Sequence, residues 1–340
     1  MDTTWQSRLQ AIPRLHMAEY PTPLEPLPRL GQELGRQVWV KRDDLLGPGL
    51  GGNKTRKLEY LLAEAQERKA RKVVTFGGLQ SNHARLTAAA ANRLGLETHL
   101  FYFDPRPQRL TGNLLINHLL GAKMHFIPLG GGGSGMTLET TIRLVRWVAL
   151  LMVGKHYFIP VGGHHWLGCL GYVQAALEID AQAREKGIEQ ATLITAAGSG
   201  GTLAGLMAGL ALVNSPLKLL GIDVGKLWKG FPASIALLAG EICSHLGRPR
   251  SFTPEEVPLI ENTYVGERYG LPSPDGLAAM HLLAHTEGLL LDPVYTAKAF
   301  AGLLDLVRRD RIKKDTPLIF LHTGGVPALF AFQKGELLHD

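Results

Sequence analysis

The feature that most constrains this fold is a regular alternation of short β-rich runs with longer helical runs. Strands are expected at residues 37–41, 72–76, 98–103, 123–127, 156–160, 191–195, 217–223 and 317–321. Helices are expected near residues 53–68, 82–94, 110–120, 136–152 and 169–186. Such alternation is typical of parallel sheets covered by helices on both faces. The sequence therefore predicts an α/β protein whose ligand lies beyond the carboxyl ends of the strands.

Glycine-rich loops fall at those expected strand ends. The chain has 40 glycines, and many cluster in "TFGGLQSNH", "VGGHHWLG", "TAAGSGGT" and "LHTGG". Glycine permits tight turns and lets the backbone approach a ligand closely. We therefore expect the four loops to converge on one cleft. A fifth segment, "IPLGGGGSGM" (127–136), resembles a linker and is predicted to be a mobile surface loop.

Composition narrows the class of protein. A chain of 340 residues with a net charge of +6 and no long basic run suits a small anionic ligand better than nucleic acid. The two cysteines, Cys169 and Cys243, lie far apart in the sequence, which fits a reducing compartment. Residues 1–30 lack the apolar core of a signal peptide. We therefore expect a cytoplasmic protein.

One uncharged stretch, residues 193–213, has the length of a membrane span. However, "LITAA" is typical of a buried strand, "GSGGT" of a loop and "LAGLMAGLALV" of a helix. We therefore predict half of a βαβ unit here and no membrane segment.

The loop "AAGSGGT" (196–202) is the candidate phosphate site. Consecutive backbone N–H groups in a glycine loop at a helix N-terminus attract anions. The motif lacks the lysine of a nucleotide P-loop and is not G-x-G-x-x-G. A single phosphate, as on pyridoxal phosphate, fits it better. The alternatives are a tight strand–helix turn, a nucleotide-dependent oxidoreductase and a non-catalytic phosphate-binding module.

Several side chains near these loops have two possible interpretations. In "GLGGNKTRKLEY", Lys54 is either an active-site amine or part of a solvated basic helix. Arg56 and Lys57 are expected on other parts of the helix surface, solvated or paired. Ser81 and Asn82 are good helix N-caps, or they bind a carboxylate or ring hydroxyl. Tyr269 and Tyr295 are either half-buried aromatics or acids aimed into a cleft.

The adjacent histidines His164 and His165 raise the question of a metal. Their side chains would point apart on a strand, and no carboxylate shares their loop. We expect structural or substrate-contacting roles and no metal site.

Taken in order, these motifs resemble a known family. The segments "KRDDLLGPGLGGNKTRKLE", "GGLQSNHAR", "GGHHWLGCLGY", "GSGGTLAGL", "YGLPS", "LDPVYTAKA" and "HTGGVPALF" are similar to those of the D-cysteine desulfhydrase and 1-aminocyclopropane-1-carboxylate deaminase family. The resemblance covers nearly the whole chain. It implies a pyridoxal-phosphate enzyme of the tryptophan-synthase-β fold (fold type II), built from two three-layer α/β/α domains with mostly parallel sheets.

The resemblance also implies roles for particular residues. Lys54 corresponds to the lysine that holds the cofactor as a Schiff base, Asn82 to the residue at the ring hydroxyl, and Thr323 to the residue beside the pyridine nitrogen. The expected phosphate loop is Gly198, Ser199, Gly200, Gly201 and Thr202. The expected catalytic set is Lys54, Ser81, Tyr269 and Tyr295, and the expected substrate site is Ser81, Asn82, His83, His164, Tyr269 and Tyr295.

Two positions separate branches of the family. The cyclopropane deaminases carry Glu after the second tyrosine and Leu before the last Gly-Gly, where this chain has Thr296 and Thr323. A threonine hydroxyl can only hydrogen-bond a ring nitrogen. The pattern therefore favours β-elimination on a small amino acid, as in D-cysteine desulfhydrase, over ring opening by a cyclopropane deaminase.

The segment "HHW" at 164–166 departs from the small polar pair of many relatives. Its bulky, potentially cationic side chains would suit an anionic β-substituent. L-cysteate sulfo-lyase activity is therefore an alternative.

The resemblance further implies domain organisation and assembly. Residues 1–48 and 160–340 are expected to form a large cofactor-binding domain, and residues 49–159 a small α/β domain, with the active site between them. A homodimer is expected because relatives are commonly dimers.

Overall fold

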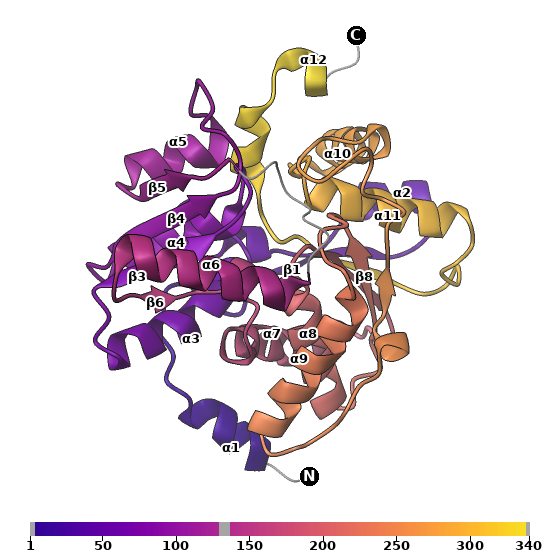
Figure 1. The fold of residues 1–340 in the computed structure, drawn as a ribbon. Helices are drawn as coiled ribbons and strands as arrows, with labels where there is room; N and C mark the ends of the chain where they lie inside the picture. The colour runs from indigo at the N-terminus through magenta and orange to yellow at the C-terminus, as the bar shows by residue number, and fades with distance from the viewer. Residues whose placement is uncertain (1–3, 129–136, 338–340) are drawn as a thin grey trace.

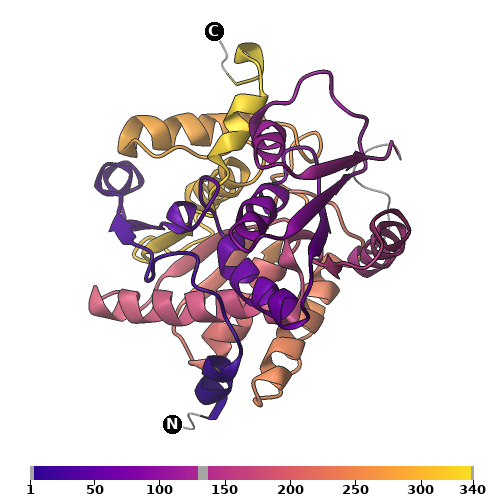
Figure 2. The same ribbon diagram turned by 90° about the vertical axis from the view of Figure 1, so that its left-hand side faces the viewer.

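The computed structural model describes residues 4–128 and 137–337. Most of the predicted linker "IPLGGGGSGM", from residue 129 onward, lies outside the described residues. Within the described ranges the chain forms two sheets with helices around them (Figures 1 and 2).

The larger sheet has six strands in the order β1-β2-β10-β7-β8-β9, and all neighbours are parallel except β1 and β2. The smaller sheet has four parallel strands in the order β5-β4-β3-β6. The strands are β1 (Leu24–Pro26), β2 (Val38–Lys41), β3 (Lys72–Phe76), β4 (Glu97–Tyr102), β5 (Lys123–Phe126), β6 (Tyr157–Phe158), β7 (Thr192–Ala197), β8 (Lys218–Asp223), β9 (Leu259–Ile260) and β10 (Leu318–Leu321).

Helices account for the covering layers. They are α1 (Thr4–Ala11), α2 (Pro28–Leu34), α3 (Lys54–Glu67), α4 (Asn82–Asn92), α5 (Gly112–Leu119), α6 (Leu138–Val153), α7 (Trp166–Glu185), α8 (Gly201–Leu212), α9 (Phe231–His245), α10 (Pro274–Glu287), α11 (Thr296–Arg308) and α12 (Lys334–Leu337). The predicted α/β class with mostly parallel sheets is confirmed. The domain boundaries near residues 48 and 160 stay a prediction.

Strand β10 shows why its sequence, "LIFL", is apolar at every position. Leu318 and Phe320 pack with α10 and α11, while Ile319 and Leu321 pack with α7 and α8. Both faces of a parallel sheet are buried under helices, so the usual alternation of polar and apolar residues is absent.

The uncharged stretch at residues 193–213 folds as predicted. It forms most of β7, a tight turn and α8. Among the described residues, no helix is both long and apolar enough to cross a membrane.

Helix α3 corrects the expectation that Arg56 and Lys57 are solvated or paired on a helix surface. Both side chains are buried, because α3 packs against α7 and the loop that follows β2. Arg56 is indeed paired, with Nη2 at 2.8 Å from Asp43 Oδ1 and Nη1 at 2.9 Å from Glu178 Oε2. Lys57 is neither solvated nor paired with a carboxylate among the described residues, so the expectation is wrong for Lys57.

The buried ion pair between Arg56 and Asp43 holds several segments of the chain together. Burial alone would raise the pKa of Asp43, yet the charge and hydrogen bonds of Arg56 hold that pKa below its usual value. The Tyr172 hydroxyl donates a further hydrogen bond to Asp43 Oδ2 at 2.6 Å. These contacts join α3, α7 and the turn after β2.

We predict that Arg56→Leu lowers the free energy of unfolding by about 3–5 kcal/mol, because it leaves Asp43 buried without its cation. Denaturant unfolding monitored by circular dichroism measures the change. The matched control is Arg68→Leu, which removes an exposed pair with Glu64 on the same helix and should cost less than about 1 kcal/mol. Equal effects of the two substitutions would contradict the assignment of Arg56 as an anchor.

Candidate active site

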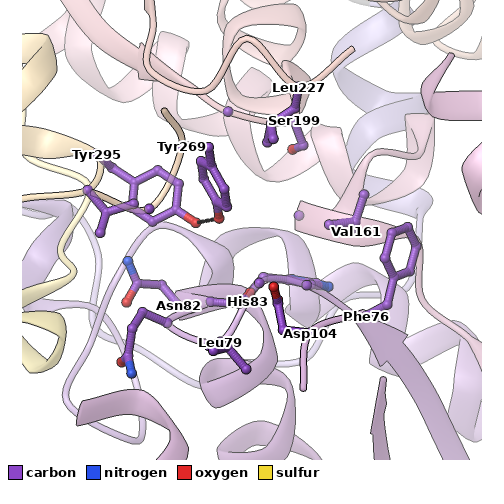
Figure 3. A pocket seen from close by; sticks show the side chains of 18 of the residues that line it. Phe76, Leu79, Asn82, His83, Asp104, Val161, Ser199, Leu227, Tyr269 and Tyr295 are labelled. Atoms are coloured by element: carbon purple, nitrogen blue, oxygen red, sulfur yellow. Dashed lines mark hydrogen bonds between the residues drawn. The ribbon is translucent and has the colours of Figure 1, made fainter. Parts of the chain in front are cut away.

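A cavity of about 820 Å³ lies between the loops of the two sheets. Each of the four glycine loops reaches the cavity. The lining residues include Gly77 of "TFGGLQSNH", Gly162 of "VGGHHWLG", Gly198 of "TAAGSGGT" and Thr323 of "LHTGG". The predicted convergence of these loops on one cleft is therefore confirmed. Figure 3 shows the cavity with Ser199 and Leu227 on one side and Asn82 and His83 on the other.

Lys54 lines the cavity at the first position of α3. The preceding residue, Asn53, ties this helix start to two loops: its backbone N–H donates to the Thr323 carbonyl oxygen (3.0 Å), and its side-chain Nδ2 donates to Thr202 Oγ1 (3.1 Å). The pKa of Lys54 lies well below its ordinary value, because burial and then the charge of Lys57 disfavour the ammonium form. A neutral amine held in this way is suited to act as a nucleophile or a base.

The loop from Gly198 to Thr202 runs into the N-terminus of α8. Gly200 has φ +79°, and a Cβ there would lie 2.6 Å from Ile235 Cγ1, so glycine is required. No side chain caps α8, which leaves its first backbone N–H groups available to an anion. The geometry therefore suits the predicted phosphate site.

Lys57 is the residue near this loop that the sequence interpretation missed. Its Nζ lies 2.9 Å from where a Cβ on Gly201 would stand, and it donates one hydrogen bond, to the Gly162 carbonyl oxygen at 3.0 Å. An ammonium group has three donors, and no carboxylate pairs with Lys57 among the described residues. The spacing of Lys54 and Lys57, three residues apart and so on one side of a helix, was the available signal.

The opposite wall is the start of α4. Ser81 Oγ accepts from the Ala84 N–H (3.2 Å), so the N-cap interpretation of Ser81 is confirmed, while its role toward the substrate stays a prediction. His83 Nε2 lies 2.9 Å from Thr75 Oγ1, while His83 Nδ1 has no hydrogen-bond partner among the described residues. Burial, followed by Lys54 and Lys57, holds the pKa of His83 well below its ordinary value. The ring is therefore neutral.

The two predicted tyrosines meet at the cavity. The hydroxyls of Tyr269 and Tyr295 are hydrogen-bonded to each other, and their rings are 5.9 Å apart at 68° (Figure 3). Burial raises the pKa of Tyr269 to about 12 and that of Tyr295 well above its ordinary value. Both hydroxyls therefore keep their protons at neutral pH. One proton lies in the bond between the two hydroxyls, and the other is free to be donated to a bound anion.

Several expected residues do not line the cavity. Gly200, Gly201 and Thr202, at the start of α8, follow Gly198 and Ser199, which do line it. His164 is not among the cavity-lining residues; its Nδ1 bonds the Ser199 carbonyl oxygen (2.6 Å), in the turn before α7 rather than on a strand. Burial, then Lys57, lowers the pKa of His164 to about 4, so it is not a cation at neutral pH. Thr296 points to Asp292 Oδ1 (2.7 Å) and does not line the cavity, whereas Thr323 does.

The residues at the cavity fit pyridoxal phosphate. The half-buried Lys54 amine has no hydrogen-bond partner among the described residues, and it shares the cavity with the neutral ring of His83 and with an uncapped glycine loop. Lys57 Nζ lies beside that loop, where its ammonium form would supply a cation, although burial lowers the pKa of Lys57. These groups match the two functional groups of the cofactor. Its aldehyde condenses with an amine, and its phosphate needs N–H donors and a positive charge.

We predict that Lys57→Met weakens the binding of pyridoxal phosphate by about tenfold or more, because one charge-assisted hydrogen bond to the phosphate is lost. Absorbance titration of the cofactor-free protein measures the affinity. Lys69→Met, which removes an exposed charge just after the same helix, is the control and should bind as the unmodified chain does. Unchanged affinity in Lys57→Met would show that Lys57 does not hold the phosphate.

Comparisons with known proteins show the family and its cofactor. Residues 15–324 match the family model described as pyridoxal-phosphate dependent enzyme. The chain is 39% identical over 334 residues to a D-cysteine desulfhydrase of Yersinia enterocolitica, covering 97% of this chain and 98% of that one. It is 38% identical over 333 residues to a D-cysteine desulfhydrase of Serratia proteamaculans, covering 96% and 98%.

Solved structures share the fold. A homologue of 1-aminocyclopropane-1-carboxylate (ACC) deaminase superposes with a TM-score of 0.85 at 34% identity over 97% of both chains. The diaminopropionate ammonia lyase of Escherichia coli, at 18% identity, superposes with a TM-score of 0.65 over 96% of this chain and 88% of that one, and shows the fold alone. The chain therefore belongs to the pyridoxal-phosphate dependent enzymes of fold type II, in the family of D-cysteine desulfhydrase and ACC deaminase.

Proposed function

We propose that this chain catalyses β-elimination on D-cysteine, which with water gives pyruvate, sulfide and ammonia. The observation that carries the proposal is the position of Lys54, a half-buried amine of lowered pKa in the same cavity as a phosphate-type glycine loop and two protonated tyrosines. Support for the substrate comes from the names of near-full-length relatives.

Bound through Lys54 and the loop from Gly198 to Thr202, pyridoxal phosphate supplies an electron sink for the α-carbon of the amino acid. The Lys54 amine, freed when the substrate amine takes its place, removes the α-proton at Nζ. Burial favours this step, because it keeps the amine neutral and so able to accept a proton.

The sulfur leaves from the β-carbon as the α-proton is lost. We propose that the Tyr269–Tyr295 pair donates a proton to the departing sulfur or a hydrogen bond to the substrate carboxylate, since both hydroxyls are protonated at the cavity. Ser81, Asn82 and His83, at the start of α4, would hold the carboxylate from the other wall. The enamine that remains reacts with water to give pyruvate and ammonia.

Thr323 supports elimination over ring opening. It lines the cavity and carries no charge, so beside a ring nitrogen it offers only a hydrogen bond. A good leaving group such as a thiolate then takes up the electron pair, whereas a cyclopropane ring has no such group. The position of His164 outside the cavity and its lowered pKa weaken the case for L-cysteate.

A substrate panel tests the reaction. D-cysteine should give pyruvate and sulfide at a rate well above that of L-cysteine, L-cysteate and 1-aminocyclopropane-1-carboxylate, with sulfite and 2-oxobutyrate also measured. Sulfite release from L-cysteate as the fastest reaction would replace the proposed substrate, and 2-oxobutyrate formation would assign ring opening.

We predict that Lys54→Ala gives a colourless protein without elimination activity, because both the attachment point and the base are removed. Visible absorbance and pyruvate release measure the two effects. Lys69→Ala, an exposed position just after the same helix, should remain coloured and active. Full activity of Lys54→Ala would contradict the proposed role of Lys54 as attachment point and base.

We further propose a cytoplasmic homodimer of two-domain chains, with boundaries near residues 48 and 160. Large apolar side chains on α6, including Trp147 at 61% exposure and Leu151 at 66%, support burial against another chain. Two free, buried cysteines support a reducing compartment.

A further inference from the structure

A chain of polar contacts runs from the phosphate loop to the small-sheet helix α6. His164 Nδ1 lies 2.6 Å from the Ser199 carbonyl oxygen, and His164 Nε2 lies 3.3 Å from Ser234 Oγ. Ser234 Oγ in turn lies 2.8 Å from Glu139 Oε1. The contacts therefore link the loop after β7, the turn before α7, α9 and α6, none of which are neighbours in sequence.

This chain of contacts needs three protons to be complete. The Ser199 carbonyl oxygen can only accept, so Nδ1 of His164 must carry a proton. The contacts on either side of Ser234 Oγ need one proton each. A neutral histidine and a serine hydroxyl supply two protons in total, so an ionised Glu139 leaves one contact without a hydrogen. The longest contact, at 3.3 Å between His164 and Ser234, is the one expected to lack it.

The surroundings of His164 explain why the third proton is missing when the loop holds no anion. Burial and Lys57 of α3 lower the pKa of His164 to about 4, and the neighbouring His165 acts in the same direction. The Ser199 carbonyl and Glu139 oppose them. Although burial would raise the pKa of Glu139, the hydrogen bond from Ser234 and other contacts hold it below its ordinary value.

A phosphate on the loop changes this balance. The His164 backbone and Lys57 Nζ lie 3.5 Å and 2.9 Å from where a Cβ on Gly201 would stand, so both flank the first residue of α8. A bound dianion adds negative charge beside the imidazole and favours its protonated form. Protonated His164 then donates to Ser199 and Ser234 together, and Ser234 donates to Glu139.

We propose that His164 is a positioning residue for the phosphate loop that takes up a proton when the cofactor phosphate binds, completing the hydrogen-bond chain from Ser199 to Glu139. The inference rests on the proposed phosphate site. Binding of the cofactor is then linked to pH, and the hydrogen bonds between α6 and the loop become complete only once the phosphate is bound. The two histidines differ in role, because His165 makes no hydrogen bond to the loop in the part of the chain that the structure describes.

Calorimetry on the full chain, freed of cofactor, tests the proton uptake. The probe is pyridoxine 5′-phosphate, which carries the phosphate but has no aldehyde to react with Lys54. Titration at one pH in two buffers of different ionisation enthalpy gives the protons taken up on binding. Near pH 6.5, the number of protons taken up when the probe binds should be larger for the unmodified chain than for His164→Asn, by about half a proton or more. Asparagine keeps a donor for Ser199 but cannot titrate.

Two further variants make the result specific. His165→Asn is the matched control and should give the count of the unmodified chain. Ser234→Ala keeps the bond from His164 to Ser199 but removes the link to Glu139, so its count should fall toward that of His164→Asn. This variant also serves if His164→Asn does not fold.

The outcomes separate the inference from the proposed function. Tight binding with the same proton count in the unmodified chain, His164→Asn and Ser234→Ala overturns the role of His164 and leaves the phosphate site intact. Failure of the unmodified chain to bind the probe overturns the phosphate site, and the inference with it. Any proton that Lys57 takes up is common to these variants and cancels in the comparison.

Discussion

The ion cluster around Arg56 determines where the first turn of α3 lies. Arg56 forms ion pairs with Asp43 and Glu178, and Lys41 forms an ion pair with the same Glu178. The Tyr172 hydroxyl donates a hydrogen bond to Asp43. Buried charges are tolerated only when all partners are in place. The cluster therefore fixes α3 against the large sheet and α7 in one arrangement. Lys54, two residues before Arg56, inherits its position from this arrangement.

The start of α3 is a junction rather than a simple helix end. Asn53 bonds both the loop after β10 and the first turn of α8, so Lys54 emerges between the two segments. One turn further along α3, the side chain of Lys57 lies beside Gly201, the first residue of α8. A single helix thus presents one amine to the cavity and another to the anion site. Burial lowers the pKa of both amines, and the charge of Lys57 lowers the pKa of Lys54 further.

The fold and the outline of the site were predictable from the sequence, while the burial of individual polar residues was not. Strand–helix alternation and glycine loops at strand ends are local signals, and they located the sheets and the cleft. Arg56 and Lys57 looked solvated because a basic helix start normally is. The segments that bury them, among them α7 more than a hundred residues away, are distant in the sequence. His164 was assigned to the substrate side for a similar reason, since its partners Ser199, Ser234 and Glu139 come from distant segments.

The glycines of the site are explained by what occupies the space of their missing side chains. A Cβ on Gly162 would collide with Ser199 Oγ, and one on Gly201 would lie 2.9 Å from both Lys57 Nζ and Cys169 Sγ. Glycine at these positions therefore does more than permit a turn. It lets the turn before α7, the phosphate loop and α3 approach until their functional groups share one small volume. The same closeness brings the backbone of His164 beside Gly201, so a charge bound at the loop is felt by the imidazole.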